Sequence, residues 1–234
     1  DDGTYKATID NELLIDGREY KLTVRTASGA EYESEYEILN SSPVIDSVYY
    51  EIEDRIENYS GEDITGLQFY IDVKAADTTS RYYRWKLIDT YEYTAKAGIS
   101  YYYYMWDYVR MSPKSTYGVY RCWLSEDVPG MYLTNTNNLI LNEKKQIPLH
   151  YVSNRTDRLK IRYSLVVEQY SLTEEAHNYF QQKKIASEDP GGLYTRQPSQ
   201  AVTNIRAKSD TDEKALGYFW ASAKTQKRLM VPKL

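Results

Sequence analysis

The sequence predicts a mainly β protein, in which a partial immunoglobulin-like β-sandwich domain precedes a larger antiparallel β-sandwich or barrel domain with one α-helix. Three observations support this prediction. Tyrosine supplies 26 of the aromatic residues, against 3 phenylalanines and 4 tryptophans, and tyrosine favours strands and amphipathic contact surfaces. Apolar and polar residues alternate in many stretches, as they do in strands with one wet face. Only one stretch has the pattern of a helix.

The sequence of residues 1–42 is expected to form the C-terminal part of an immunoglobulin-like domain. Apolar and polar residues alternate from Tyr20 to Arg25, and turn dipeptides that end in Gly17 and Gly29 separate the strands. This stretch supplies about three strands, whereas an immunoglobulin-like sandwich needs about seven. We therefore expect earlier strands of the domain to precede this sequence.

A second, β-rich domain is expected over residues 43–234. The stretch 40–47 suits a linker, because Pro43 lacks the backbone donor that a strand ladder uses. The alternation that predicts strands is clearest in two apolar sets: Leu67, Phe69, Ile71, Val73 and Ala75, and then Leu159, Ile161, Tyr163 and Leu165. Closing strands are expected at about 202–207, 215–223 and 228–231.

The one predicted helix spans about 173–187. Ser171 and Glu174 fit a capping box at its start. Glutamates in the first turn and lysines towards the end suit the helix dipole. The helix is expected to pack through a narrow apolar stripe: Ala176, Tyr179 and Phe180.

The stretch "SYYYYMWDY" at residues 100–108 is the most unusual part of the sequence. Successive side chains of a strand point to opposite faces, so both faces of this strand would be aromatic. Such a strand needs cover on its second face, from another part of the chain, a partner protein or a small ligand. Because aromatic residues dominate interface hot spots, the candidate contact residues are Tyr102, Tyr104, Trp106 and Tyr108.

No motif of a catalytic or metal site is apparent, and we predict no catalytic residue, no metal ligand and no cofactor. His150 and His177 lack a second ligand at metal spacing. Cys122, the only cysteine, is expected to be a buried thiol. The formal net charge of −5 offers no basic surface, so no nucleic-acid partner is expected. The two carboxylates of a glycoside hydrolase need to be close in space but not in sequence. Their presence cannot be judged from the sequence, so a hydrolase stays open as an alternative.

Several segments, taken in order, resemble a family of Bacteroidetes cell-envelope proteins catalogued as a domain of unknown function, DUF4249. They are "DGTYKA", "GREYKLTVRTASGAEYES", "PVIDSVYY", "YYRWKLIDTYEY", "RCWL" and, most specific, "AVTNIRAKSDTDEKALGYFWAS". The resemblance implies a lipoprotein of the cell outer membrane, with a lipid anchor outside this sequence and a TonB-dependent receptor as partner. Ser47 and Thr78 lie in triplets that resemble the O-glycosylation pattern of that phylum.

Two functions are therefore expected. The first is that of a non-enzymatic accessory lipoprotein, which docks on a TonB-dependent receptor or another outer-membrane β-barrel complex and assists nutrient capture, gating or assembly. The alternative is a stand-alone module that binds a glycan or a peptide on its aromatic surface.

Overall fold

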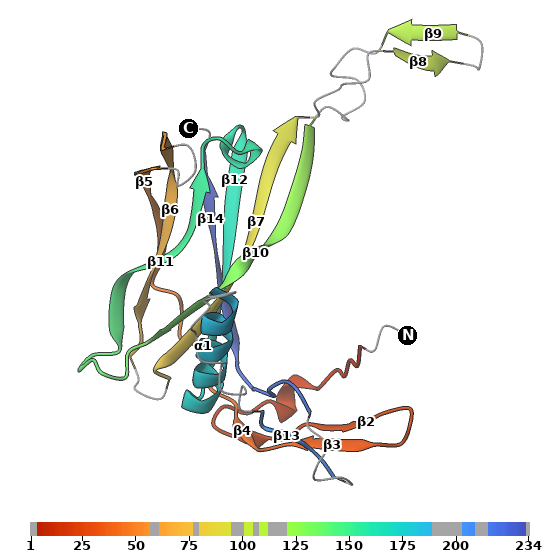
Figure 1. The fold of residues 1–234 in the computed structure, drawn as a ribbon, viewed down its shortest axis with the longest axis vertical. Coiled ribbons are helices and arrows are strands. Elements are labelled where there is room, and N and C mark those ends of the chain that lie inside the picture. The colour runs from red at the N-terminus through yellow and green to blue at the C-terminus, as the bar shows by residue number, and fades with distance from the viewer. Residues whose placement is uncertain are drawn as a thin grey trace.

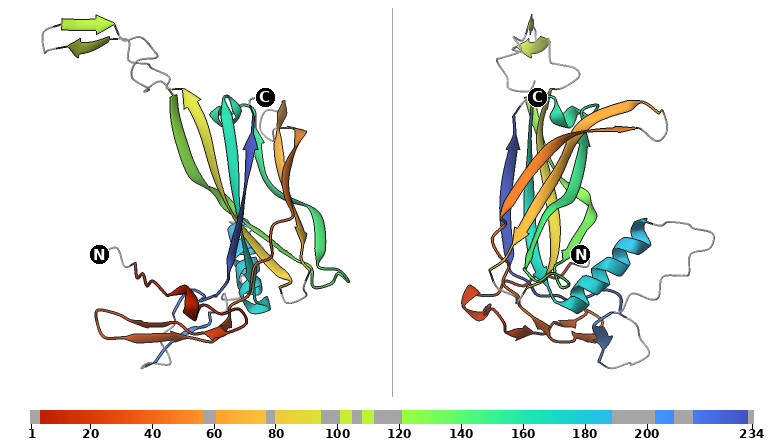
Figure 2. Two further views of the ribbon diagram at one scale, coloured as in Figure 1. Left: turned by 180° about the vertical axis from the view of Figure 1, so that it is seen from behind. Right: turned by 90° about the vertical axis from the view of Figure 1, so that its left-hand side faces the viewer.

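A computed structural model describes residues 4–56, 61–76, 80–94, 101–104, 108–111, 121–188, 203–208 and 215–232. In this part of the chain the structure is mainly β, with several antiparallel sheets and a single α-helix, which confirms the predicted fold class. Figures 1 and 2 show an open sandwich with a small hairpin beyond one end and short N-terminal strands at the other end.

Two antiparallel sheets form the sandwich. The larger sheet has the order β10-β7-β12-β14 and consists of β7 (Tyr82–Thr94), β10 (Arg121–Asn135), β12 (Arg162–Leu172) and β14 (Lys224–Val231). The smaller sheet has the order β11-β6-β5 and consists of β5 (Ser47–Ile56), β6 (Asp63–Lys74) and β11 (Glu143–Ser153). Strands β5 and β14 contact each other along one side of the sandwich.

The main core lies between these sheets. Leu67, Phe69 and Ile71 of β6 have no exposed surface, and they face Trp85 of β7 and Leu165 of β12 across the core. Each such side chain stabilises the fold by roughly 1.5–3 kcal/mol on burial. The alternation in β6 is thus confirmed, although Ala75 follows the end of the strand.

The second predicted apolar set is only partly a strand. Residues Asp157–Leu159 form a short 3-10 helix, η2, and β12 begins at Arg162. The backbone amide of Lys160 bonds to the Asp157 carbonyl and closes the turn. The Leu159 side chain still reaches the core, so its burial did not require a strand.

Helix α1 (Glu174–Glu188) packs against the end of the larger sheet. The predicted cap at Ser171 is wrong, because β12 extends to Leu172 and Ser171 is still part of that strand. Thr173 caps the helix instead: its hydroxyl oxygen accepts the Ala176 amide at 3.2 Å. The predicted apolar stripe is confirmed, since its members join a second core: Leu172, Ala176 and Phe180, with Tyr82, Leu133, Tyr179, Tyr218 and Trp220 packed against them.

The N-terminal residues form short strands after a 3-10 turn, η1 (Asn11–Leu13). Strand β1 (Glu19–Tyr20) pairs with β4 (Glu37–Ile38), and β2 (Thr23–Arg25) pairs with β3 (Glu31–Ser34). Strand β13 (Ile205–Ala207), from the far end of the chain, adds to the other side of β3. The boundary near residue 42 stays a prediction, and the C-terminal region contributes a strand to the N-terminal sheet.

The strand expected at 215–223 is absent from the described residues 215–223, which hold only one isolated bridge, between Asn40 and Ser222. Gly217 has a φ of 122°, which interrupts an extended ladder. Trp220 packs edge-on against Phe180 of α1 at 5.7 Å between ring centroids. The alternating aromatic residues therefore cover the helix and do not pair in a sheet.

Candidate functional site

The tyrosine-rich stretch forms a separate β-hairpin. Strand β8 (Tyr101–Tyr104) pairs antiparallel with β9 (Tyr108–Met111), and no other described strand pairs with either. Figure 1 draws this hairpin beyond the ends of β7 and β10, apart from both sheets of the sandwich. The stretch is therefore not a core strand of the sandwich.

The hairpin register brings part of the predicted contact set together. Tyr104 lies directly opposite Tyr108, and Tyr102 lies opposite Arg110, two positions along the same ladder. Trp106 falls outside the described residues. Val109, on β9, is 58% exposed. A two-stranded hairpin is at best marginally stable in water, so this one gains stability from any surface that covers it.

Of the two predicted glycosylation positions, the structure describes only Ser47. Ser47 begins β5 and donates its hydroxyl hydrogen to the Asp72 carboxylate at 2.8 Å. Thr78 lies outside the described residues. Cys122 is half-buried on the edge strand β10, in a stretch whose neighbouring residues are exposed, so the expectation of a buried thiol is wrong.

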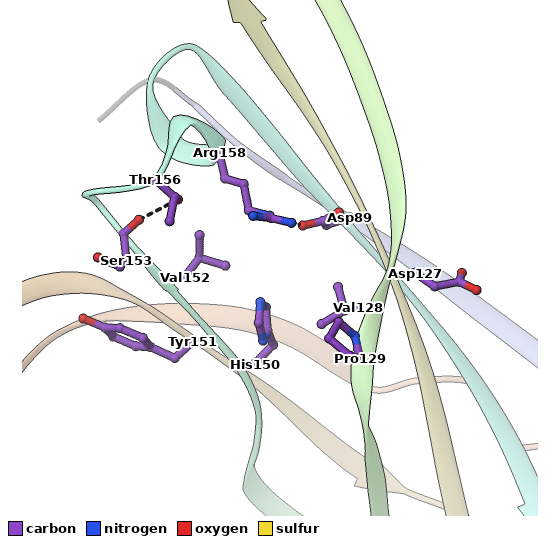
Figure 3. Close-up of a pocket in the computed structure, with 10 residues that line it drawn as sticks. All are labelled: Asp89, Asp127, Val128, Pro129, His150, Tyr151, Val152, Ser153, Thr156 and Arg158. Atoms are coloured by element: carbon purple, nitrogen blue, oxygen red, sulfur yellow. Dashed lines mark hydrogen bonds and ion pairs between the residues drawn. The ribbon is translucent and has the colours of Figure 1, made fainter. Parts of the chain in front are cut away.

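A cavity of about 350 Å³ opens between the two sheets, on the side away from the β5 and β14 contact. Strands β7, β10 and β11 and the turn η2 supply its lining. Figure 3 shows the side chains that face it: Asp89, Val128, His150, Val152 and Arg158. Asp127 also borders the cavity, but its carboxylate turns away in Figure 3 and pairs with Lys86 at 3.0 Å.

An ion pair between the buried Asp89 and the half-buried Arg158 borders this cavity. Asp89 has no exposed surface, and the Arg158 guanidinium donates from Nε to its Oδ2 at 2.8 Å. Arg158 also contacts Glu126 at 3.0 Å. The hydrogen bond to Asp89 raises the pKa of Arg158. The other carboxylate oxygen of Asp89, Oδ1, is buried without a hydrogen-bond partner among the described residues, so the pair offsets only part of the cost of burying the carboxylate.

His150 lies across the cavity from this ion pair. Burial lowers the pKa of His150, so its imidazole is neutral near pH 7. The Asp89 carboxylate is paired and the His150 imidazole is neutral. The arrangement therefore suits a structural role, in which the ion pair holds η2 on the larger sheet.

The pattern of β7 indicates a polar site at this end of the core, although it matches no known motif. Tyr83, Trp85 and Leu87 occupy the inward-facing positions of β7, and Asp89 continues the same phase. A charged residue at an inward position requires a partner of opposite charge or a polar cavity. The partner, Arg158, is far along the chain, so its identity could not be predicted from spacing.

In the described part of the chain, no three histidine, cysteine or acidic side chains are grouped so that they could hold a metal ion. No helix there is long and apolar enough to cross a membrane.

No curated protein and no solved structure matches the chain. The family model described as a domain of unknown function, DUF4249, matches residues 1–228. The match covers nearly the whole length, and the chain belongs to the DUF4249 family.

Proposed function

We propose that this protein is a non-enzymatic accessory protein of the cell envelope, which docks through the β8 and β9 hairpin on an outer-membrane β-barrel protein. A TonB-dependent receptor is the partner that the family resemblance suggests. In this role the protein assists nutrient capture, gating or assembly. A lipid anchor outside this sequence would hold it at the outer membrane.

The separate hairpin is the observation that carries the proposal. Its strands pair only with each other among the described strands, so both outer edges keep backbone groups that can pair with another chain. Tyrosine adds a large contact area with few rotatable bonds, which keeps the entropic cost of docking low. A short hairpin that is marginal alone and rich in tyrosine suits a docking element.

Purification from native membranes under gentle detergent tests this function. We expect a β-barrel protein to co-purify with the wild-type chain, and the variant Tyr102→Ser/Tyr104→Ser to lose it. The matched control is Tyr5→Ser/Tyr36→Ser, which removes two tyrosines that are 63% and 64% exposed in the N-terminal region. A lone monomer from the wild type, or equal loss in both variants, contradicts the proposal.

A further inference from the structure

We propose that the turn between β10 and β11 inserts into the surface of an anionic lipid bilayer. Three consecutive apolar residues form this turn, here called the apolar turn: Leu139, Ile140 and Leu141. Their exposed fractions are 43%, 97% and 68%. A run of exposed aliphatic side chains costs solubility and marks a contact surface. This inference is independent of the hairpin and of the docking function.

The apolar turn has a fixed conformation. Arg81 donates from Nη1 to the carbonyl oxygens of Thr136 and Leu139 at 2.8 and 2.9 Å. Thr136 and Asn142, both buried, close the base of the turn through a 2.6 Å hydrogen bond from the threonine hydroxyl to the Asn142 side-chain oxygen. Asn142 also donates to the Ser80 carbonyl at 2.7 Å. A preformed turn loses little entropy when its tip is buried elsewhere.

The charge beside the apolar turn favours lipid phosphate. The described residues next to it supply four cations, Lys74, Arg81, Lys144 and Lys145, and three carboxylates, Asp72, Glu143 and Glu174. Glu143 is paired with Lys145 at 3.1 Å and lies opposite Lys74 in the sheet register. Each cation near an anionic surface strengthens binding, and long lysine side chains reach headgroups while the apolar tip enters the acyl region.

The amino-acid composition of the apolar turn favours lipid over protein as its binding partner. Protein interfaces depend on aromatic and arginine anchors that fill pockets, whereas the exposed side chains of this turn are leucine and isoleucine. Aliphatic side chains beside cations are typical of elements that lie in the bilayer interface.

The apolar turn lies far from the hairpin, so the two surfaces can be tested separately. Strand β10 has 15 residues and leads from the hairpin side to the apolar turn. At the usual rise per residue, the strand separates its two ends by roughly 45 Å. Figure 1 shows the connection from β10 to β11 at the end opposite the hairpin.

Vesicle flotation with the full chain tests the inference. We expect the wild type to float with vesicles of phosphatidylethanolamine and phosphatidylglycerol, and to bind vesicles of phosphatidylcholine more weakly. The variant Ile140→Asp is expected to bind the anionic vesicles at least about tenfold more weakly, because one buried aliphatic side chain contributes about that factor. Added salt should also weaken wild-type binding.

The control variant is Leu216→Asp, which changes a leucine that is 95% exposed outside the apolar turn. It should bind like the wild type. Both substituted side chains are exposed, so the thermal midpoint of each variant should equal that of the wild type. Absence of wild-type flotation, retention of binding by Ile140→Asp, or equal loss in Leu216→Asp would each overturn the proposal.

Discussion

Tyr218 donates its phenolic hydrogen to the carboxylate of Glu37, which joins the segment after β13 to strand β4. Glu37 is only 5% exposed. Thr173, the cap of α1, donates to the same carboxylate at 2.9 Å, and Asn204 donates from its side-chain amide at 3.3 Å. One carboxylate therefore connects the N-terminal strands, the start of the helix and the C-terminal region.

This carboxylate predicts a pH dependence of stability. Burial raises the pKa of Glu37 above its ordinary value of 4.5, so the folded protein holds this proton more tightly than the unfolded chain. Its contribution to the free energy of unfolding is then largest below pH 4.5 and falls as the pH rises through the raised pKa. Urea unfolding of the wild type and of Glu37→Gln should show a wild-type advantage that shrinks with rising pH. A difference that stays constant or grows contradicts the pKa shift.

The Asp89 and Arg158 pair predicts a loss of stability when one charge is removed. Arg158→Met leaves the Asp89 carboxylate buried without its partner, and we expect the free energy of unfolding to fall by about 3 kcal/mol. The double variant Asp89→Asn/Arg158→Met should recover part of this loss, since no unpaired charge remains. Chemical denaturation measures both values.

The matched control for this pair is Lys160→Met. Lys160 pairs with Asp157 at 2.5 Å, but the two side chains are 61% and 50% exposed. Exposed ion pairs contribute at most about 1 kcal/mol. Equal losses in Arg158→Met and Lys160→Met would show that burial of Asp89 does not matter.

Local patterns in the sequence predicted those elements whose burial follows a simple period. Strand β6 is an example, because its inward residues all face the core. The helix was also predicted, but its cap was assigned to Ser171 because the end of β12 depends on pairing with distant strands. Spacing along the chain does not encode such pairing.

The sequence was least informative where distant segments meet. The alternation around Tyr218 and Trp220 fits a strand, but it fits equally well a segment that packs over the helix. Tyr218 contacts Glu37 and Trp220 contacts Phe180, so the segment packs over the helix. The cavity residues Asp89 and Arg158 come from separate elements for the same reason. The apolar turn, in contrast, is visible in the sequence as a short aliphatic run, but its exposure depends on the fold.

Gly66 of β6 lies where any larger residue would clash with its neighbours. A Cβ atom at this position would lie 2.5 Å from the Val152 carbonyl oxygen and 2.5 Å from the Tyr151 ring. Gly66→Ala should therefore lower the free energy of unfolding by about 1–3 kcal/mol. Thermal unfolding measures this loss. The double variant Gly66→Ala/Tyr151→Leu should stay destabilised because the backbone oxygen cannot move away, and full recovery would show that only the ring clashes.

The most direct test of hairpin docking is site-specific photocrosslinking in intact cells. A photoreactive residue in place of Tyr104 should form one adduct, with an outer-membrane β-barrel protein. The same residue in place of Tyr36, which is 64% exposed on another part of the molecule, should not form it. Absence of an adduct at position 104, or the same adduct at both positions, would contradict docking through the hairpin.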